Sequence, residues 1–370
     1  MKKRGSAVNK KSTIRDVAQL AGVSVATASR VLSDSGYRVS ERTAQRVREA
    51  AQSLDYVPND AARALRRESN RDIALVIPNV SNPFYLQAML GIDDVLRNNA
   101  RNMILCNTMS NVELEHLCLR QLYERQAWGV ILSSVDENAE QIERYRAKGM
   151  KFVMLDQMMI GQESMGICFD SRAGARMATD HLIGRGHRRI AFATLPQARW
   201  TRTEMLRGYT DALSAAGLPF DASLVYEGRP DREEARSNLE LRAGQWIARA
   251  FMRDGCPATA ILCINDMLAI GVMQTLMKSG VRVPDDVSVM GFDDIPLAEI
   301  YLPALTTVRY PAVEAGRMAA LLMLDSLSDQ AFDPHFSMQV SPQLVIRDSV
   351  KDADARRVNE LAAACAPDPL

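Results

Sequence analysis

Apolar residues near the start of the chain recur with a helical period. In "TIRDVAQLA" they follow the spacing i, i+3, i+4, i+7, which predicts a short helix with one buried stripe. Thr13 is expected to cap this helix, with Asp16 three residues later as in a capping box. Gly22 is expected to end it by taking a positive φ. The same period returns in "SVATASRVLS", where Ser24 is the candidate cap.

A third helix follows, with Ser40 as its cap and Pro58 as the residue expected to end it. Two short helices joined by a turn of three or four residues with a glycine are typical of a helix-turn-helix. We therefore expect residues 12–57 to form a three-helix DNA-binding unit, preceded by a basic arm at residues 1–11.

In a helix-turn-helix the second helix enters the major groove by its N-terminal end. Arg30 is suited to a bidentate contact with guanine, and Val25 and Ala26 to contact with a thymine methyl group. The alternative is that these are solvent-facing residues with no partner. The residues of this unit expected to contact DNA are Thr13, Ser24, Val25, Ala26, Thr27, Ser29 and Arg30.

Residues 58–69 contain "NDAARALRRES", which predicts a basic helix of about two turns, capped by Asn59. A helix this short is marginally stable in water on its own. We expect a linker that folds on DNA.

Beyond residue 70 the pattern changes to short apolar runs separated by helical patterns. The runs "DIALVIP", "NMILCNT", "GVILSS" and "KFVMLD" fill the first half, and "RIAFATL", "SLVYEG", "TAILCIN" and "VSVMGFD" the second. This alternation predicts parallel sheets with helices on both faces, arranged as two lobes, one from each half. The expected core is residues 70–350, and residues 351–370 are expected to form a mostly mobile tail with no tetramerisation zipper.

Polar and aromatic residues cluster at the carboxyl ends of these runs, where open α/β sheets bind ligands. They are Asn82, Phe84, Tyr85, Ser133, Ser134, Asp156, Asn265, Asp266 and Asp293. Carboxylates and amides suit the hydroxyl groups of a sugar, and aromatic faces suit its C–H groups. Each residue also has a structural alternative: Asp266 as a helix cap, Asp156 as the end of a strand, Phe84 as core.

Charge is distributed unevenly although the net charge is zero. Residues 1–69 carry 14 Lys and Arg against 7 Asp and Glu, so the rest of the chain is acidic by the same margin. A basic N-terminal segment indicates a polyanionic partner or a solvated arm. The six cysteines show no metal-ligand spacing and there is no apolar leader or membrane-length apolar run, so we expect reduced thiols and a cytoplasmic, nucleoid-associated protein without metal or cofactor.

The stretches "TIRDVAQLAGVSVATASRVLS" and "VSERTAQRVREAAQSLDYVPNDAARALR" resemble the lactose-repressor/galactose-repressor family of bacterial transcription regulators. The resemblance continues through "SNPFYLQAMLGIDDVL", "DHLIGRGHRRIAF", "AILCINDMLAIGVMQTLMKSGVRVPDDVSVMGFDDI" and "YLPALTTVRYP", over about residues 12–350. It implies an all-α three-helix head with a hinge helix, followed by a two-lobed α/β core like the type I periplasmic sugar-binding proteins. It also implies a homodimer on a pseudo-palindromic operator.

By the same resemblance, Leu65 matches the hinge leucine that wedges into the minor groove, with Arg63 and Arg66 on the flanking phosphates. The alternative for Leu65 is a contact between two hinge helices. Many relatives carry an arginine three residues before a Gly-aromatic pair, where this chain has Met205. If Arg199 or Arg202 replaces it, a sugar acid becomes a plausible effector, as in gluconate-type repressors of the family; if neither does, a neutral ligand is favoured.

The residues expected to contact the effector are Phe84, Tyr85, Ser133, Asp156, Arg199, Arg202, Met205, Asn265, Asp293 and Tyr310. No metalloprotease, nucleophile-elbow, phosphate-loop or dinucleotide motif is present, so we expect no enzyme. We expect a ligand-responsive repressor of a carbohydrate or sugar-acid operon. The main alternative is the same kind of regulator with a purine or nucleoside corepressor; a carbohydrate-active enzyme or a solute-binding protein is a distant one.

Overall fold

The computed structural model describes residues 12–32, 39–56, 72–156, 165–195, 199–229, 235–328 and 336–355. It divides the chain into two units, Met1–Asn70 and Arg71–Leu370. The hinge residues Asn59, Arg63, Leu65 and Arg66 lie outside the described residues.

The described part of the first unit consists of α1 (Ile14–Ala21), α2 (Val25–Leu32) and α3 (Glu41–Ser53). Thr13 and Asp16 form the predicted capping box, and Gly22 ends α1 with φ 62°. The Ser24 hydroxyl accepts a hydrogen bond from the Thr27 amide at 3.1 Å and so begins α2. Small buried side chains from all three helices make the core: Val17, Ala18, Ala21, Ala28, Val47, Ala50 and Ala51.

The third helix ends earlier than Pro58. It stops at Ser53 because Asp55 takes a left-handed conformation with φ 44°, and the Tyr56 amide turns back to donate to the Ala51 carbonyl at 2.9 Å. The backbone therefore leaves the helical path before it reaches the proline.

The first lobe of the second unit is built on a parallel sheet in the order β11-β5-β4-β3-β1-β2. Its strands are β1 (Ile73–Ile77), β2 (Met103–Asn107), β3 (Gly129–Leu132), β4 (Lys151–Asp156), β5 (Gly166–Phe169) and β11 (Ser337–Val340). Ile73 and Leu75 of β1 pack in one hydrophobic cluster and Ala74 in another. Both faces of the sheet are thus buried, which explains why its strands are continuous apolar runs.

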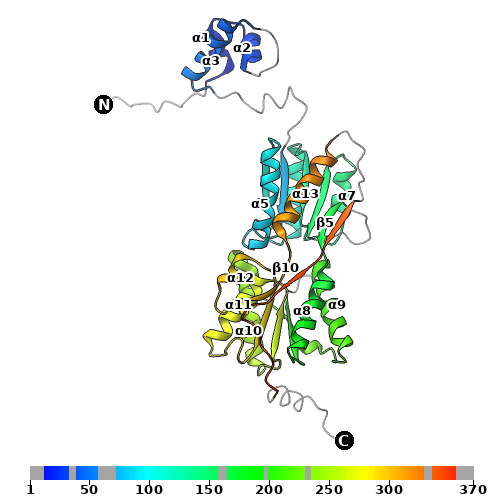
Figure 1. The fold of residues 1–370 in the computed structure, drawn as a ribbon. Coiled ribbons are helices and arrows are strands. Elements are labelled where there is room, and N and C mark those ends of the chain that lie inside the picture. The colour runs from blue at the N-terminus through cyan, green and yellow to red at the C-terminus, as the bar shows by residue number, and fades with distance from the viewer. Residues whose placement is uncertain are drawn as a thin grey trace, which may run out of the picture. The chain divides into compact units, whose positions relative to one another are not determined.

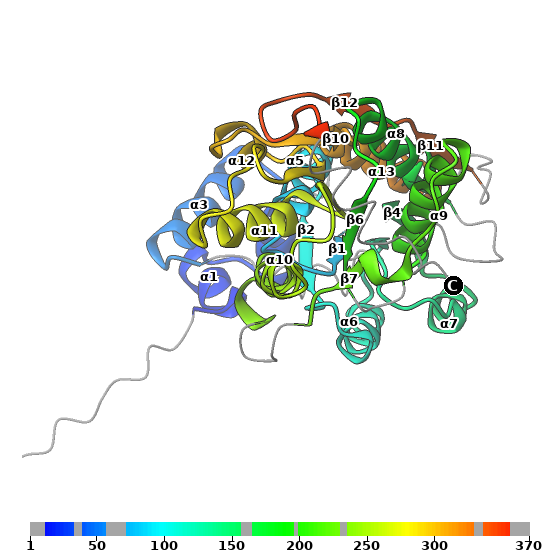
Figure 2. The same cartoon turned by 90° about the horizontal axis from the view of Figure 1, so that it is seen from below.

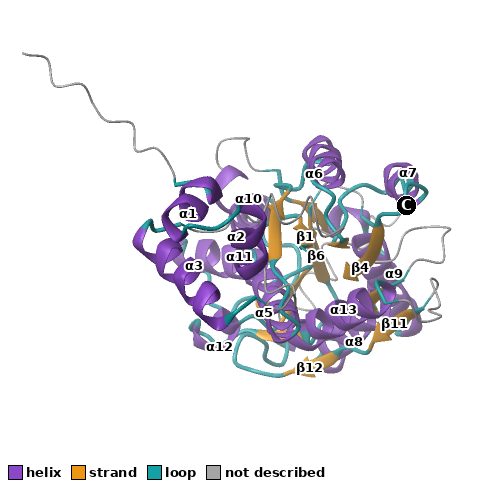
Figure 3. Ribbon diagram, turned by 90° about the horizontal axis from the view of Figure 1, so that it is seen from above, coloured by secondary structure: helices purple, strands orange, loops and turns teal. Residues whose placement is uncertain are grey.

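Helices cover the two faces of this sheet, as the purple helices beside the orange strands show in Figure 3. α5 (Pro83–Asn98) and α13 (Ala312–Ser326) supply side chains to the first cluster, and α6 (Val112–Glu124) and α7 (Glu140–Arg146) to the second. The helical patterns expected between the apolar runs of this half correspond to α5, α6 and α7.

The second lobe has a sheet in the order β12-β10-β9-β8-β6-β7. Its strands are β6 (Ile190–Thr194), β7 (Val225–Glu227), β8 (Ala260–Cys263), β9 (Ser288–Asp293), β10 (Thr306–Arg309) and β12 (Gln343–Val345), and β12 pairs antiparallel with β10. α8 (Ser171–Gly184) and α9 (Trp200–Ala215) lie on the opposite side of these strands from α10 (Ala235–Arg253) and α11 (Asp266–Lys278), as Figures 1 and 2 show. η1 (Ala222–Leu224) and α12 (Pro296–Ile300) complete the lobe.

The prediction of one lobe from each half of the chain is wrong in its connectivity. After β10 the chain returns to the first lobe for α13 and β11 and then crosses again to β12. The crossing segments contact one another: the rings of Phe169 and Tyr310 stack with centroids 4.5 Å apart, and the Tyr310 hydroxyl donates to the Asp170 carbonyl at 3.3 Å. The return of α13 depends on close helix contact, since a Cβ at Gly91 would lie 1.9 Å from the Val313 carbonyl oxygen.

The prediction of a mobile tail from residue 351 onward places the start of the tail too early. The Ala353 amide donates to the Arg185 carbonyl at 2.8 Å, and Lys351 pairs with Asp285 at 2.8 Å. The buried His187 holds the same segment, because its ring nitrogens lie 2.8 Å from the Thr259 hydroxyl and 3.1 Å from the Lys351 carbonyl. Residues 351–353 therefore belong to the second lobe, and residues 356–370 lie outside the described residues.

Candidate functional site

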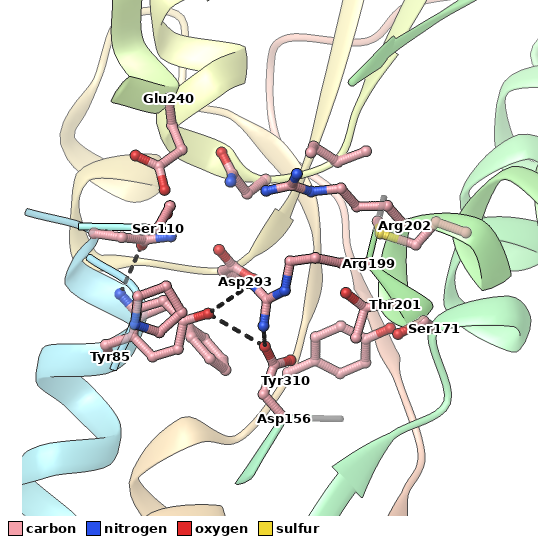
Figure 4. A pocket seen from close by; sticks show the side chains of 16 residues that line it. Tyr85, Ser110, Asp156, Ser171, Arg199, Thr201, Arg202, Glu240, Asp293 and Tyr310 are labelled. Atoms are coloured by element: carbon pink, nitrogen blue, oxygen red, sulfur yellow. Dashed lines mark hydrogen bonds and ion pairs between the residues drawn. The ribbon is translucent and has the colours of Figure 1, made fainter. Parts of the chain in front are cut away.

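A pocket lies where the carboxyl ends of strands from both lobes meet, and we call it the interlobe pocket (Figure 4). Its cavity volume is about 70 Å³, which is smaller than most small-molecule sites, so the lobes lie close around it. Its lining residues are Pro78, Asn82, Phe84, Tyr85, Ser110, Asp156, Ser171, Arg199, Thr201, Arg202, Met205, Glu240, Ile264, Asn265, Asp293 and Tyr310.

All the predicted effector residues except Ser133 line this pocket. Ser133 is fully buried and donates a hydrogen bond to the Tyr85 hydroxyl at 3.4 Å, so it supports a lining residue. No sequence pattern indicated Glu240, which lies on α10 two residues after the non-helical Asn238 (φ −165°). Ser110 was also missed; it follows β2 in a left-handed conformation with φ 53°.

Arg199 links the two lobes. It belongs to the second lobe, where it precedes α9, and its guanidinium reaches groups at the strand ends of the first lobe. Nη1 donates to the Tyr85 hydroxyl at 3.3 Å, and Nη2 donates to the Ser133 hydroxyl at 3.3 Å and the Ser134 carbonyl at 3.2 Å. Nη2 also lies 3.5 Å from an Asp156 carboxylate oxygen. With only 8% of its side chain exposed, this arginine is a nearly buried charge whose counter-ion comes from the other lobe.

A second polar bridge between the lobes joins Asn79, just after β1, to Glu240 of α10. The Asn79 amide donates to the Glu240 carboxylate at 2.5 Å. Burial raises the pKa of Glu240, which the hydrogen bond and the charge of Arg202 oppose.

Two of the residues that supply carboxylates to the pocket have a backbone conformation that residues other than glycine rarely adopt. Asp156 ends β4 with φ 77°, and Asp293 ends β9 with φ 104°. Such conformations cost about 1–3 kcal/mol and cluster at functional sites. Burial raises the pKa of both carboxyls. Arg199 opposes this rise at Asp156, whereas the charges of Asp266 and of the pocket residues Asp156 and Glu240 add to it at Asp293.

The adjacent pair Asn265 and Asp266 has divided roles. Asn265 lines the pocket and is also the residue that caps α11, since its side chain accepts from the Leu268 amide at 2.8 Å. Asp266 does not line the pocket and is fully buried, accepting from the Thr307 hydroxyl at 2.6 Å and the Ile295 amide at 2.9 Å. The alternative that Asp266 caps this helix is therefore wrong, because Asn265 is the cap and Asp266 binds Thr307 and Ile295 in the interior.

Apart from Thr13, which caps α1, the described candidate DNA-contact residues lie on or next to α2 in the first unit. Ser24, Val25, Ala26 and Arg30 are exposed, Val25 at 43%, and Thr27 and Ser29 are half-buried. Thr13 is exposed but its hydroxyl is 2.7 Å from the Asp16 carboxylate, to which it donates. The N-terminal half of α2 thus presents small side chains at its surface, and Arg30 is exposed in its last turn.

Each of the two units matches a known protein-family model. Residues 13–59 match the model of bacterial regulatory proteins of the lacI family, and residues 179–350 match the periplasmic binding protein-like domain. The chain is similar to the HTH-type transcriptional repressor PurR of Photobacterium profundum, with 32% identity over 92% of this chain and 99% of the relative. The chain belongs to the LacI family.

Two further likenesses support this assignment. The HTH-type transcriptional regulator GalR of Escherichia coli is 33% identical over 92% of this chain and 96% of its own length. Among solved structures, the lac repressor dimer bound to operator and the anti-inducer ONPF has a TM-score of 0.76 and 25% identity over 92% of this chain and all of that one.

As a LacI-family protein, the chain is a ligand-responsive, DNA-binding transcription regulator and not an enzyme. The helical DNA-binding region and the two-sheet α/β core predicted from the sequence are both confirmed. Within the described ranges, no helix combines the length and apolar character needed to cross a membrane.

Proposed function

We propose that this LacI-family regulator is a cytoplasmic, dimeric repressor whose affinity for a pseudo-palindromic operator is set by a sugar or sugar acid in the interlobe pocket. The observation that carries the proposal is the polar lining on both lobes: Asp156 on the first, and Arg202, Glu240, Asn265 and Asp293 on the second. A ligand with hydroxyl groups around its whole edge would find a carboxylate, amide or guanidinium in each direction.

The distribution of aromatic residues favours a sugar over a purine. Phe84 and Tyr85 come from α5, and Tyr310 follows β10 where the chain crosses between the lobes. The remaining second-lobe lining among the described residues has no aromatic side chain, so no ring there faces Phe84 across the pocket. A planar base usually gains much of its affinity from a pair of flat faces, whereas a sugar needs one face and many polar contacts.

The coupling to DNA would run through the lobes. Arg199 and Asn79 already bond across the pocket, so a ligand that adds bonds to both sides would stabilise one relative position of the lobes. In a dimer this position would set the spacing of the hinge segments that carry Asn59, Arg63, Leu65 and Arg66. A coupling of this kind is typically about 1–3 kcal/mol, or about 5–150-fold in operator affinity.

The experiment begins with the full chain and a random DNA library, from which the preferred operator is selected. A thermal-shift screen follows, with hexoses, pentoses, sugar acids, sugar phosphates, disaccharides, purines and nucleosides. A ligand at 100 times its Kd adds about 2.7 kcal/mol to stability, which is readily measured. The best ligand is then titrated into the protein–operator complex and followed by fluorescence anisotropy.

We expect a selective sugar or sugar-acid hit that changes operator affinity. Asp293→Asn should abolish the thermal shift. The control is Asp180→Asn, which changes an exposed residue of α8 outside the pocket and should leave the thermal shift unchanged. A selective purine or nucleoside hit would instead favour the corepressor alternative.

A further inference from the structure

A short loop of the first lobe supplies two of the groups that bind Arg199. It comprises residues 133–136, directly after β3, and we call it the acceptor loop. Nη2 of Arg199 is 3.3 Å from the Ser133 hydroxyl and 3.2 Å from the Ser134 carbonyl of this loop. Hydrogen bonds weaken steeply when their geometry is poor, so the conformation of the acceptor loop determines how well Arg199 links the lobes.

A buried carboxylate outside the interlobe pocket binds the same loop. Glu115 of α6 is 1% exposed and does not line the pocket. Its Oε1 accepts a hydrogen bond from the Ser134 hydroxyl at 2.5 Å, and its Oε2 accepts one from the Val135 amide at 2.7 Å. Burial raises the pKa of Glu115, whereas these two hydrogen bonds favour its charged form. The carboxylate therefore holds two successive residues of the acceptor loop.

Glu115 and Arg199 bind opposite ends of one peptide group. The peptide bond between Ser134 and Val135, which we call the central peptide, is trans, so its N–H and C=O point in opposite directions. The N–H donates to Glu115, and the C=O accepts from Arg199. A carboxylate thus lies at the positive end of the peptide dipole and a guanidinium at its negative end. Hydrogen bonds in such a chain polarise and strengthen one another.

Other contacts hold the two ends of the acceptor loop. The Ser133 amide donates to the Val76 carbonyl at 3.0 Å, and the Asp136 carboxylate lies 2.7 Å from the ring of His116. These contacts fix where the loop begins and ends. The orientation of the central peptide then depends on Glu115, which binds its N–H directly.

We infer that Glu115 is a positioning residue for the link between the lobes, because it orients the central peptide and thereby the carbonyl that binds Arg199. The inference rests on the proposed function only where the lobes are coupled to operator affinity. A merely structural role would confine the effect of Glu115 to the first lobe. A positioning role extends it to the start of α9, since the Arg199 carbonyl accepts from the Thr203 amide at 3.0 Å.

The experiment is hydrogen exchange of the full chain, without ligand or DNA, followed in the acceptor loop and in the first turn of α9. Glu115→Ala should raise the exchange rate of both segments at least about threefold and leave α11 of the second lobe unchanged. Glu115→Gln should restore most of the protection, because its amide can accept from Val135 and donate to the Ser134 hydroxyl. The matched control is Glu113→Ala, an exposed residue of the same helix, which should change neither segment.

Two further variants test whether the effect passes through Arg199. Arg199→Met should itself loosen the first turn of α9. Adding Glu115→Ala to it should speed exchange in the acceptor loop but not further in α9, since residues that act through one network are not additive. Ser134→Ala, which removes one of the two hydrogen bonds to Glu115, is a milder variant and should raise exchange in both segments by less.

Several results would overturn the inference. Faster exchange in the acceptor loop alone would make Glu115 a structural residue of its own lobe, and faster exchange in α11 as well would indicate a general loss of stability. Additive effects in α9 would mean that Glu115 acts by another route than Arg199. If Glu115→Gln restored the loop but not α9, the charge of Glu115 rather than its positioning would be responsible. None of these results depends on an effector, so the sugar-responsive repressor stands or falls separately.

Discussion

The DNA-contact face and the interlobe pocket are built in opposite ways. The face is formed by one helix of eight residues, and the side chains at its start are small and mostly exposed. The pocket gathers charged, largely buried side chains from segments between Pro78 and Tyr310, several of them bonded across the lobes. Substitutions on α2 should therefore change DNA binding with little effect on folding. Substitutions in the pocket should change stability and ligand binding together.

The largest effect is expected from separating the buried cross-lobe pair. Asp156→Asn keeps the side-chain shape and tolerates the left-handed backbone but removes the counter-ion of Arg199. Breaking a buried ion pair costs about 3–5 kcal/mol, so we expect a loss of about 3 kcal/mol in the free energy of unfolding of the second unit, measured with urea.

The control is Asp94→Asn, which removes the exposed partner of Arg317 at 3.1 Å and should cost less than about 1 kcal/mol. Equal losses in the two variants would mean that the Arg199–Asp156 pair contributes no more than a surface ion pair.

A second effect should appear as a pH dependence of the stability of the second unit. Burial lowers the pKa of His187 to about 4, so the folded protein keeps this ring neutral while the unfolded chain protonates it below about pH 6.5. Between these values the unfolded state binds more protons, and stability rises with pH by up to about 3 kcal/mol. His187→Gln should flatten this part of the urea-unfolding profile between pH 4.5 and 7.

The difference between the two profiles isolates His187, because the buried carboxyls whose pKa values are raised remain in both proteins. His116→Gln, a half-exposed histidine beside Asp136, is the control and should keep the rise with pH. A profile unchanged by His187→Gln would exclude His187 as its source.

A smaller and different effect is expected on the DNA-contact face. Arg30→Ala should weaken binding to the selected operator by about 1–3 kcal/mol and binding to random DNA much less, because a bidentate contact reads one base. The urea midpoint should not change. Arg48→Ala on α3, with a side chain 57% exposed, is the control and should affect both DNAs alike. If Arg30→Ala weakens both equally, Arg30 contacts phosphate rather than a base.

The two regions also differ in how far the sequence predicts them. The helical unit follows from local signals: the caps at Thr13, Ser24 and Ser40 and the turn at Gly22 lie where they were expected. The strands with long apolar runs were found for the same reason. β5, β10, β11 and β12 were missed. β10 begins with two threonines, and β11 and β12 are exposed or half-exposed edge strands without an apolar run.

From the residues alone, the pocket was predicted mainly where its residues end or follow a recognisable strand, whereas Arg199, Arg202 and Met205 were expected from the family resemblance. Asp156, Asn265 and Asp293 do so, and all three line it. Glu240 does not, because its position depends on how α10 packs and on the crossing of the chain between lobes. That Arg199 bonds the opposite lobe is likewise a property of tertiary packing, which one sequence does not encode locally.

The smallest effect is expected at Thr13, and it tests whether one residue can both cap a helix and contact DNA. Thr13 was expected to contact DNA, yet its hydroxyl closes the capping box of α1 with Asp16. Thr13→Ala should lower the stability of the helical unit by about 1 kcal/mol, seen as faster hydrogen exchange of the α1 amides, and Thr13→Ser should restore it. If the serine variant restores exchange protection and operator affinity together, the hydroxyl is sufficient for both. If it restores protection alone, the methyl group of Thr13 contributes to DNA binding. Thr13 would then both stabilise α1 and contact DNA.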